Sequence, residues 1–141
     1  GLGQLILGAK RMSTELEMLV WVTTMTLLMW FPYIIPAVIK NGVMAAFSRQ
    51  GDESAPYLWT ERAKRAHNNA IENLIPFAAL VLVSHVTNVS NEITQSAAIA
   101  YFWLRVAHYF AYTFGIAPLR TLFFSGGWLA QLFIVFQILS H

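Results

Sequence analysis

Side chains that can bind an anion are clustered in one short stretch, ERAKRAHNNAIENLIPF, at residues 61–77. On a helix, which turns about 100° per residue, five of these side chains fall within an arc of roughly 100°. They are Glu61, Arg65, Asn68, Asn69 and Glu72. Arg65 and Asn69 are four residues apart and Asn69 and Glu72 are three apart, so we expect each to hydrogen-bond the next. The stretch predicts one polar face on a helix that continues into an apolar segment.

A second polar stripe lies at residues 101–112. Its members follow steps of four, three and four residues, which places them along one side of a helix. They are Tyr101, Arg105, His108 and Tyr112. Because an unpaired carboxylate at apolar depth costs a few kcal/mol, Glu72 needs a cation, and Arg105 is the candidate. The same pair would serve equally well as a structural clamp that specifies helix packing.

A third group begins at Arg120, with Thr121 beside it. Phe124, Gly127 and Gln131 fall on about the same helical face as Arg120. The two glycines of the SGGW segment are small enough to let another helix approach closely.

Together the three groups predict a hydrated cavity that is rich in positive charge and opens toward the cytoplasm. Arg65, Arg105 and Arg120 outnumber Glu72 among its expected lining residues. The expected occupant is therefore an anion, and arginine is well suited to hold carboxylates in a two-pronged grip. Apolar walls would receive a hydrophobic second ligand from the lipid.

The elements that must position these side chains are expected to be membrane helices. The chain has 141 residues, of which 57% are hydrophobic and 11% charged, and its mean hydropathy is +0.53. Four apolar stretches have about the length of 20 residues that crosses a bilayer. They cover residues 18–39, 73–91, 93–119 with Arg105 inside, and 121–141. Continuous apolar runs favour helices over barrel strands, so we expect an all-α membrane protein, a four-transmembrane-helix bundle.

The distribution of basic residues predicts the orientation. They flank the first connection, whereas residues 88–92 contain no lysine or arginine, so the first loop should face the cytoplasm. Arg62 and Lys64 are read here as charges that only set this topology. Pro32 and Pro36 predict a kink late in the first span. We expect residues 13–141 to form a single domain, preceded by an N-terminal extension or expression remnant at residues 1–12, and residues 51–56 to form a loop of soluble character.

The three polar groups also resemble the motifs of a known family, the MAPEG proteins, small four-helix membrane proteins of eicosanoid and glutathione metabolism. Residues 61–77 resemble the family's E-R-x-x-R-A-x-x-N-x-x-E signature, which opens its second helix. RVAHYFAY, residues 105–112, is similar to the R-x-x-H-x-x-A-Y of the third helix, and PLRTLFFSGGW, residues 118–128, to the arginine-led start of the fourth. Among the branches, microsomal glutathione transferase of the detoxifying type is most similar, with prostaglandin E synthase close behind.

The resemblance implies a homotrimer with a site at each subunit interface, where helices of two neighbours hold glutathione and an electrophile arrives from the bilayer. Six residues would bind glutathione by position: Arg65, Asn69, Glu72, Arg105, His108 and Tyr112. Arg120 would be the catalytic residue that stabilises the thiolate. Thr121 stands where some members carry a hydroxyl near the sulfur.

These observations lead to a hypothesis of a glutathione-dependent transferase or peroxidase that acts on hydrophobic electrophiles or lipid hydroperoxides. The chain has no cysteine, so the sulfur must come from a ligand. No histidine has a second ligand at metal spacing, and side chains such as Tyr101, Tyr112, His67 and His108 are more often interfacial or satisfied interior groups than catalysts.

We expect the protein to contact membrane lipids but not nucleic acid. Its expected location is the endoplasmic reticulum or a bacterial inner membrane, with the active site facing the cytoplasm.

Two alternative functions remain open at this point. One is a non-catalytic accessory protein of the same fold that binds lipid. The other is a proton or ion pathway built from Glu72, Arg105, His108 and Tyr112.

Overall fold

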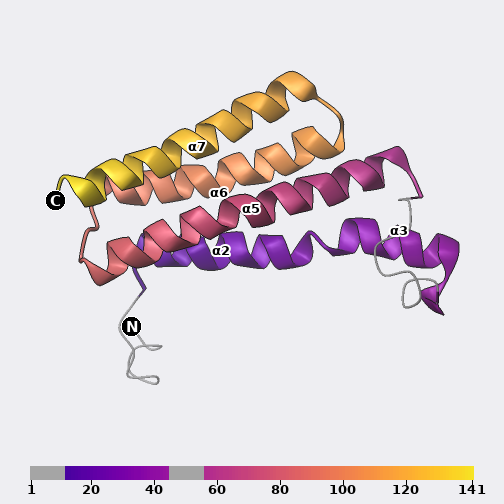
Figure 1. The fold of residues 1–141 in the computed structure, drawn as a ribbon, viewed down its shortest axis with the longest axis horizontal. Coiled ribbons are helices and arrows are strands. Elements are labelled where there is room, and N and C mark those ends of the chain that lie inside the picture. The colour runs from indigo at the N-terminus through magenta and orange to yellow at the C-terminus, as the bar shows by residue number, and fades with distance from the viewer. Residues whose placement is uncertain (1–11, 45–55) are drawn as a thin grey trace.

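The computed structural model describes residues 12–44 and 56–141, and its regular elements in those ranges are all helices. They are α2 (Thr14–Leu28), α3 (Phe31–Asn41), α5 (Leu58–Val86), α6 (Glu92–Thr113) and α7 (Ala117–Leu139). The helices run side by side, up and down, so that the α6–α7 turn lies at the same end as α3, and the C-terminus lies at the opposite end (Figure 1). The expected extension, apart from Met12, and the loop at residues 51–56, apart from Pro56, lie outside the described residues.

Three helical segments are long and apolar enough to cross a membrane: Thr14–Asn41, which joins α2 and α3, Leu58–Val86, and Ala117–Leu139. The expectation of an all-α chain is confirmed for the described residues. α6 does not belong to these three, and its span stays a prediction. It nevertheless exposes large apolar side chains, Trp103 at 62% and Phe110 at 51%, as a helix in contact with lipid would.

The kink expected in the first span is a complete break. α2 ends at Leu28, and Met29 and Trp30 form a turn before α3 begins. Pro32 lies in the first turn of α3 and has no N–H to donate to the carbonyl of Leu28, which favours a break between α2 and α3. Pro36 lies inside α3 without ending it.

The core lies where α2, α5, α6 and α7 meet. Ala63, Ala66 and Ala70 are buried on one side of α5, and their small size lets the neighbouring helices approach closely. The ring of Phe77 stacks on that of Tyr101 on α6, with centroids 4.0 Å apart and an interplanar angle of 12°. α6 and α7 form the most extensive helix pair.

The two glycines of α7 explain this close pairing. A Cβ atom at Gly127 would lie 3.7 Å from both Cδ of Arg105 and the ring of Tyr101, and one at Gly126 would lie 3.1 Å from Leu104. The expectation that these glycines permit the close approach of a helix is confirmed.

A buried carboxylate joins the helices at the end of the bundle that contains the C-terminus. Glu15 is 3% exposed and accepts hydrogen bonds from the hydroxyl of Ser90, at 2.9 and 3.2 Å, and from that of Thr94 at 3.3 Å. Asn91 caps α6 by accepting from the backbone N–H of Thr94 at 3.0 Å, and it donates to Gln137 on α7 at 2.9 Å. Glu15 therefore lies at the positive end of the α6 dipole, which stabilises its negative charge.

The opposite end of α6 is covered by an arginine of α5. Gly115 ends the turn after α6 with φ at +75°, and its N–H donates to the carbonyl of Tyr112 at 3.1 Å. A Cβ atom at Gly115 would lie 2.6 Å from the guanidinium carbon of Arg62. Arg62 is therefore more than the topology-setting charge expected from the sequence, because it packs against the negative end of the α6 dipole.

Replacing Glu15 should test the carboxylate at the α6 N-terminus. We expect Glu15→Ala to lower the free energy of unfolding by about 2 kcal/mol, because it removes the hydrogen bonds that Ser90 and Thr94 donate to a charged acceptor. Glu15→Gln, which keeps one acceptor oxygen, should lose less. The measurement is thermal unfolding in detergent. Glu17→Ala, at an exposed position of the same helix, is the control. An equal loss of stability in both variants would show that Glu15 does not stabilise the N-terminal end of α6.

Replacing Gly115 should test the cover over the α6–α7 turn. Gly115→Ala should cost about 1–2 kcal/mol, because an L-residue is strained at positive φ, and its methyl group should displace the Arg62 guanidinium. Arg62→Ala should then destabilise the parent chain but have little effect in the Gly115→Ala background. Unfolding of both single variants and the double variant forms the cycle. Fully additive losses would show that Arg62 does not stabilise this turn.

Candidate functional site

The polar residues of α5 lie on one face of the helix, as the sequence predicts. Glu61, Arg65, Asn68 and Glu72 are exposed, while Asn69 is half-buried at the margin of the same face. The buried alanines of α5 lie on the other side. This face is thus directed away from the interior of its own chain.

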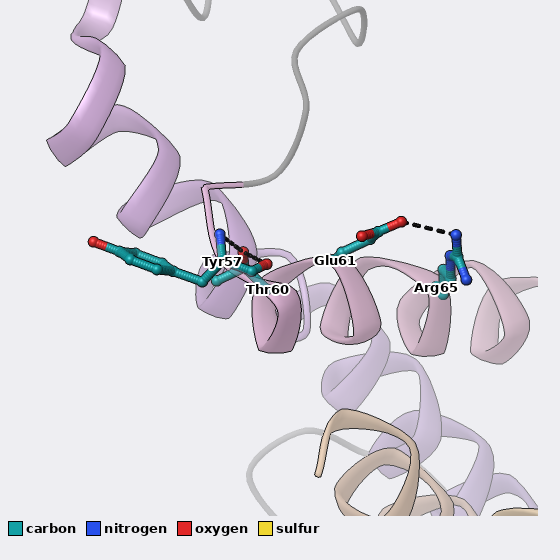
Figure 2. A network of polar contacts seen from close by, with 4 residues as sticks. All are labelled: Tyr57, Thr60, Glu61 and Arg65. Carbon is teal, nitrogen blue, oxygen red and sulfur yellow. Dashed lines mark hydrogen bonds and ion pairs between the residues drawn. The ribbon is translucent and has the colours of Figure 1, made fainter. Parts of the chain in front are cut away.

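The hydrogen bonds along this face differ from those expected. Nη2 of Arg65 lies 2.8 Å from Oε1 of Glu61, one turn earlier, and the two side chains are 64% and 48% exposed (Figure 2). The expected bond from Arg65 to Asn69 is replaced by this ion pair, because a carboxylate is a stronger acceptor for a guanidinium than an amide is. Figure 2 also shows the start of α5, where Thr60 accepts from the backbone N–H of Tyr57 at 3.1 Å.

The expected pairing of Arg105 with Glu72 is wrong for this chain. Arg105 is 3% exposed, and its Nη2 donates to Oδ1 of Asn69 at 2.6 Å. Glu72 is exposed, and no ion pair with Arg105 is found within residues 12–44 and 56–141. Asn69 takes the place of Glu72 because it is the residue of the polar arc closest to the interior.

The second stripe faces inward along α6, as expected from its spacing. Tyr101, Arg105 and His108 are each 3% exposed or less. The His108 ring lies 5.7 Å from that of Tyr112 and 6.2 Å from that of Phe124 on α7. Its Nδ1 is buried without a hydrogen-bond partner in the described part of the chain. A buried ring nitrogen without a partner is uncommon in folded proteins.

Arg120 lies at the end of this stripe. Its guanidinium carbon is 4.8 Å from the centre of the Tyr112 ring, a cation–π contact that holds the charged group in place. Arg120 belongs to the first turn of α7, where the helix dipole adds positive charge. Thr121 beside it is exposed.

Sequence reasoning missed two polar residues next to this site. Asn73 donates from Nδ2 to the carbonyl of Asn69 at 2.9 Å and to its Oδ1 at 3.3 Å. The spacing of four residues was a signal that could have identified it. Tyr33 on α3 lies 2.8 Å from Nδ1 of His67, which makes His67 a satisfied interior group, in contrast to His108.

The three arginines of the expected cavity thus occupy different depths. Arg105 is buried inside the chain, Arg120 is half-buried where α7 begins, and Arg65 is exposed on the polar face of α5. A ligand that reaches Arg65 as well as Arg120 would have to bind against the outer face of α5. The arrangement is suited to an extended anion with several acceptor groups.

Comparison with protein families gives one match. The family model described as the MAPEG family matches residues 18–140, which is nearly the whole chain. No curated protein matches the chain. With three helices that are apolar enough to cross a bilayer, the family match describes a multi-pass membrane protein. The chain belongs to the MAPEG family.

Proposed function

We propose that this protein is a glutathione-dependent transferase or peroxidase that acts on hydrophobic electrophiles or lipid hydroperoxides. Membership of the MAPEG family supports a glutathione-related function of this kind. The observation that carries the proposal is the guanidinium of Arg120, which is held over the Tyr112 ring at the start of α7. A fixed positive charge at this position can stabilise the sulfur anion of a bound thiol.

The chemistry depends on the thiolate of glutathione. A free thiol has a pKa of about 8.5 and is only a few per cent ionised at neutral pH. A guanidinium close to the sulfur lowers the thiol pKa, because the positive charge favours the ionised form. Arg120 would raise the thiolate fraction in this way, and the positive end of the α7 dipole acts in the same direction.

The thiolate can react by two routes. In transfer, sulfur forms a bond to an electrophilic carbon, and the leaving group departs with the electron pair. In peroxidase chemistry, sulfur takes the terminal oxygen of a hydroperoxide, the O–O bond breaks, and an alcohol leaves with a proton from solvent. The resulting sulfenic acid of glutathione condenses with a second glutathione to give the disulfide and water.

The polar face of α5 would hold the peptide part of glutathione. Glu72 would accept from its ammonium group, and Arg65 and Asn69 would donate to its carboxylate or carbonyl oxygens. An exposed polar face on a helix that is apolar enough to cross a membrane needs a cover inside a bilayer. A neighbouring subunit would supply that cover, which supports the proposed homotrimer with a site at each subunit interface.

The distribution of charge supports access to glutathione from the cytoplasm. Five basic residues lie close to three helix ends: Lys40 in the last turn of α3, Arg62, Lys64 and Arg65 near the start of α5, and Arg120 in the first turn of α7. These helix ends lie at the end of the bundle that contains α3 and the α6–α7 turn (Figure 1). Basic residues at one end favour a cytoplasmic location for that end. The proposed membrane is the endoplasmic reticulum or a bacterial inner membrane.

An apolar groove between α2, α3 and α6 supports a hydrophobic second substrate. Its volume is about 330 Å³, and aromatic side chains of Trp21, Phe102 and Phe110 belong to its walls. The same groove would also serve the second candidate function, lipid binding without chemistry by an accessory protein of this family. Formation of a glutathione thiolate separates the two functions.

Arg120 variants test the proposed mechanism. Arg120→Ala should keep the assembly but abolish the ultraviolet absorbance of bound thiolate and reduce turnover of a hydrophobic electrophile at least 100-fold, by analogy with the loss of one preorganised electrostatic contact. Arg120→Lys should retain part of both, because it keeps the charge. Lys64→Ala is the control for removal of a basic residue at the same end of the bundle. Unchanged turnover in Arg120→Ala would remove Arg120 from the mechanism.

A further inference from the structure

A cavity of about 220 Å³ lies where the start of α2, the end of α5 and the connection from α5 to α6 meet. These segments are at the end of the bundle that contains the C-terminus, whereas α7 begins, with Arg120 in its first turn, at the opposite end (Figure 1). Polar groups in the lining come from Ser13, Glu15, Ser84, His85, Asn88 and Ser90. The proposed function uses none of them.

Glu15 gives this cavity a negative charge. The residue is 3% exposed, and its carboxylate accepts hydrogen bonds from the hydroxyls of Ser90 and Thr94. Hydroxyl groups satisfy carboxylate oxygens but do not neutralise their charge. Among residues 12–44 and 56–141 the structure has one ion pair, between Arg65 and Glu61, so Glu15 has no cationic partner in these ranges. Burying a carboxylate is costly without a cation, which indicates that a positive group belongs in the cavity.

The wall opposite in sequence to Glu15 is fixed by the end of α5. Asn88 has a left-handed backbone with φ at 59°, and its N–H donates to the carbonyl of His85 at 3.2 Å. The N–H of Val89 donates to the carbonyl of Ser84 at 2.9 Å, and the Ser84 hydroxyl donates back to the carbonyl of Val89. The connection is thus fastened to the last turn of α5, and a ligand does not have to order it.

The helix dipoles also favour a cation here. The N-terminal end of α6 is positive and stabilises the ionised form of Glu15. The C-terminal end of α5 is negative, and its last turn contributes Ser84 and His85 to the cavity lining. This end of α5 therefore adds to the attraction that the carboxylate exerts on a positive group.

The size and chemistry of the cavity select an organic ammonium group. A water molecule has a share of about 30 Å³ in the liquid, so a bare monovalent metal ion would leave much of the space unfilled. A primary ammonium has three N–H donors, which match the carboxylate of Glu15 and the side-chain oxygens of Ser13 and Asn88. Quaternary ammonium groups are bound by cages of aromatic rings. The described lining residues include no Phe, Tyr or Trp, so a primary amine is favoured.

The cavity lies at the depth of lipid headgroups. Glu15 is in the first turn of the candidate span Thr14–Asn41, and Ser84 and His85 are in the last turn of the span Leu58–Val86. The ends of membrane spans meet the headgroup region of the bilayer. A headgroup amine and a small amine from solution can both reach a site at this depth.

We propose that this cavity binds the primary ammonium group of a small amine, free in solution or as the headgroup of an aminophospholipid, with Glu15 as its counter-ion. The inference does not rest on the proposed function, because the cavity and Arg120 lie at opposite ends of the bundle. Glu15 then has two tasks: it joins α2 to the start of α6, and it holds the cation.

Ethanolamine is the probe for the first experiment, which measures thermal unfolding of the full chain in detergent at constant ionic strength. Ethanolamine should raise the midpoint in a saturable way, because a ligand that binds only the folded state stabilises it. Choline and sodium chloride at the same concentrations should not. Glu15→Gln keeps an acceptor oxygen but removes the charge, and should raise the Kd for ethanolamine at least about 10-fold.

Glu17→Gln removes the same charge at an exposed position of α2 and should bind ethanolamine as the parent does. Equal stabilisation by choline or by sodium chloride would overturn the choice of a primary ammonium. Unchanged binding in Glu15→Gln, or equal losses in Glu15→Gln and Glu17→Gln, would overturn the site.

Asn88→Gly carries the test if Glu15→Gln does not fold. Glycine adopts positive φ without strain, so the connection keeps its backbone and Glu15 keeps its hydrogen bonds. The loss of one amide oxygen from the lining should raise the Kd for ethanolamine about 3- to 10-fold. An unchanged Kd in Asn88→Gly would contradict the placement of the amine in this cavity.

Nanodiscs identify the source of the amine. If the headgroup supplies it, the parent should be more stable in phosphatidylethanolamine than in phosphatidylcholine, and Glu15→Gln should abolish that difference. If the amine is a free one, ethanolamine should stabilise the parent equally in both lipids.

A variant of the chain's own basic residues tests the remaining occupant. Lys10 and Arg11 precede the described residues in the sequence. If ethanolamine stabilises the double variant Lys10→Ala, Arg11→Ala but not the parent, a basic side chain of the chain itself is the counter-ion, and the inference fails. Formation of a glutathione thiolate should be the same in Glu15→Gln and the parent, so failure of the proposed function leaves this test unaffected.

Discussion

The positively charged guanidinium of Arg105 is buried inside an apolar bundle, and residues of α5 and α7 accommodate it there. Gly127 lets α7 lie against the aliphatic part of Arg105, and Asn69 on α5 accepts from its charged end. Removing such an ion from water costs several kcal/mol, which only a well-placed partner offsets. An amide oxygen satisfies one N–H group but does not neutralise the charge, and Nε has no partner in the described part of the chain. The surroundings of Arg105 therefore retain a positive charge that favours an anion nearby.

The position of Arg105 depends in turn on how α6 is held at its two ends. A carboxylate from α2, Glu15, lies at the positive N-terminal end of α6, and a guanidinium from α5, that of Arg62, lies at its negative C-terminal end. Each charge is opposite in sign to the end of the helix dipole beside which it lies. Because the two contacts lie at opposite ends of α6, they limit movement of the helix along its own axis. Arg105 and His108 face inward because they lie on the buried side of α6.

Local periodicity explains which features of the site could be predicted from the sequence. The polar face of α5, the inward stripe of α6 and the close approach at the SGGW segment all follow from helical geometry and side-chain size. The partners of these residues could not be predicted in the same way. Whether Arg105 meets Asn69 or Glu72 depends on the rotation of α6 against α5, and the bond from Ser90 to Glu15 joins positions 75 residues apart. Even for Arg65, two hydrogen-bond acceptors lie one turn away, Glu61 and Asn69. Arg65 pairs with Glu61, which carries the negative charge.

The exposed face of α5 connects assembly with ligand binding. Inside a bilayer, Glu61, Arg65, Asn68 and Glu72 cannot remain in contact with lipid at low cost, so a second copy of the chain, a ligand or both must cover them. Under the homotrimer proposed above, the ligand and the neighbouring subunit share this surface. A ligand that neutralises the surplus positive charge would then favour the assembled state, because anything that binds only that state stabilises it by mass action. Under that proposal, the buried charge of Arg105, which no carboxylate neutralises among the residues that the structure describes, would contribute to both anion binding and subunit association.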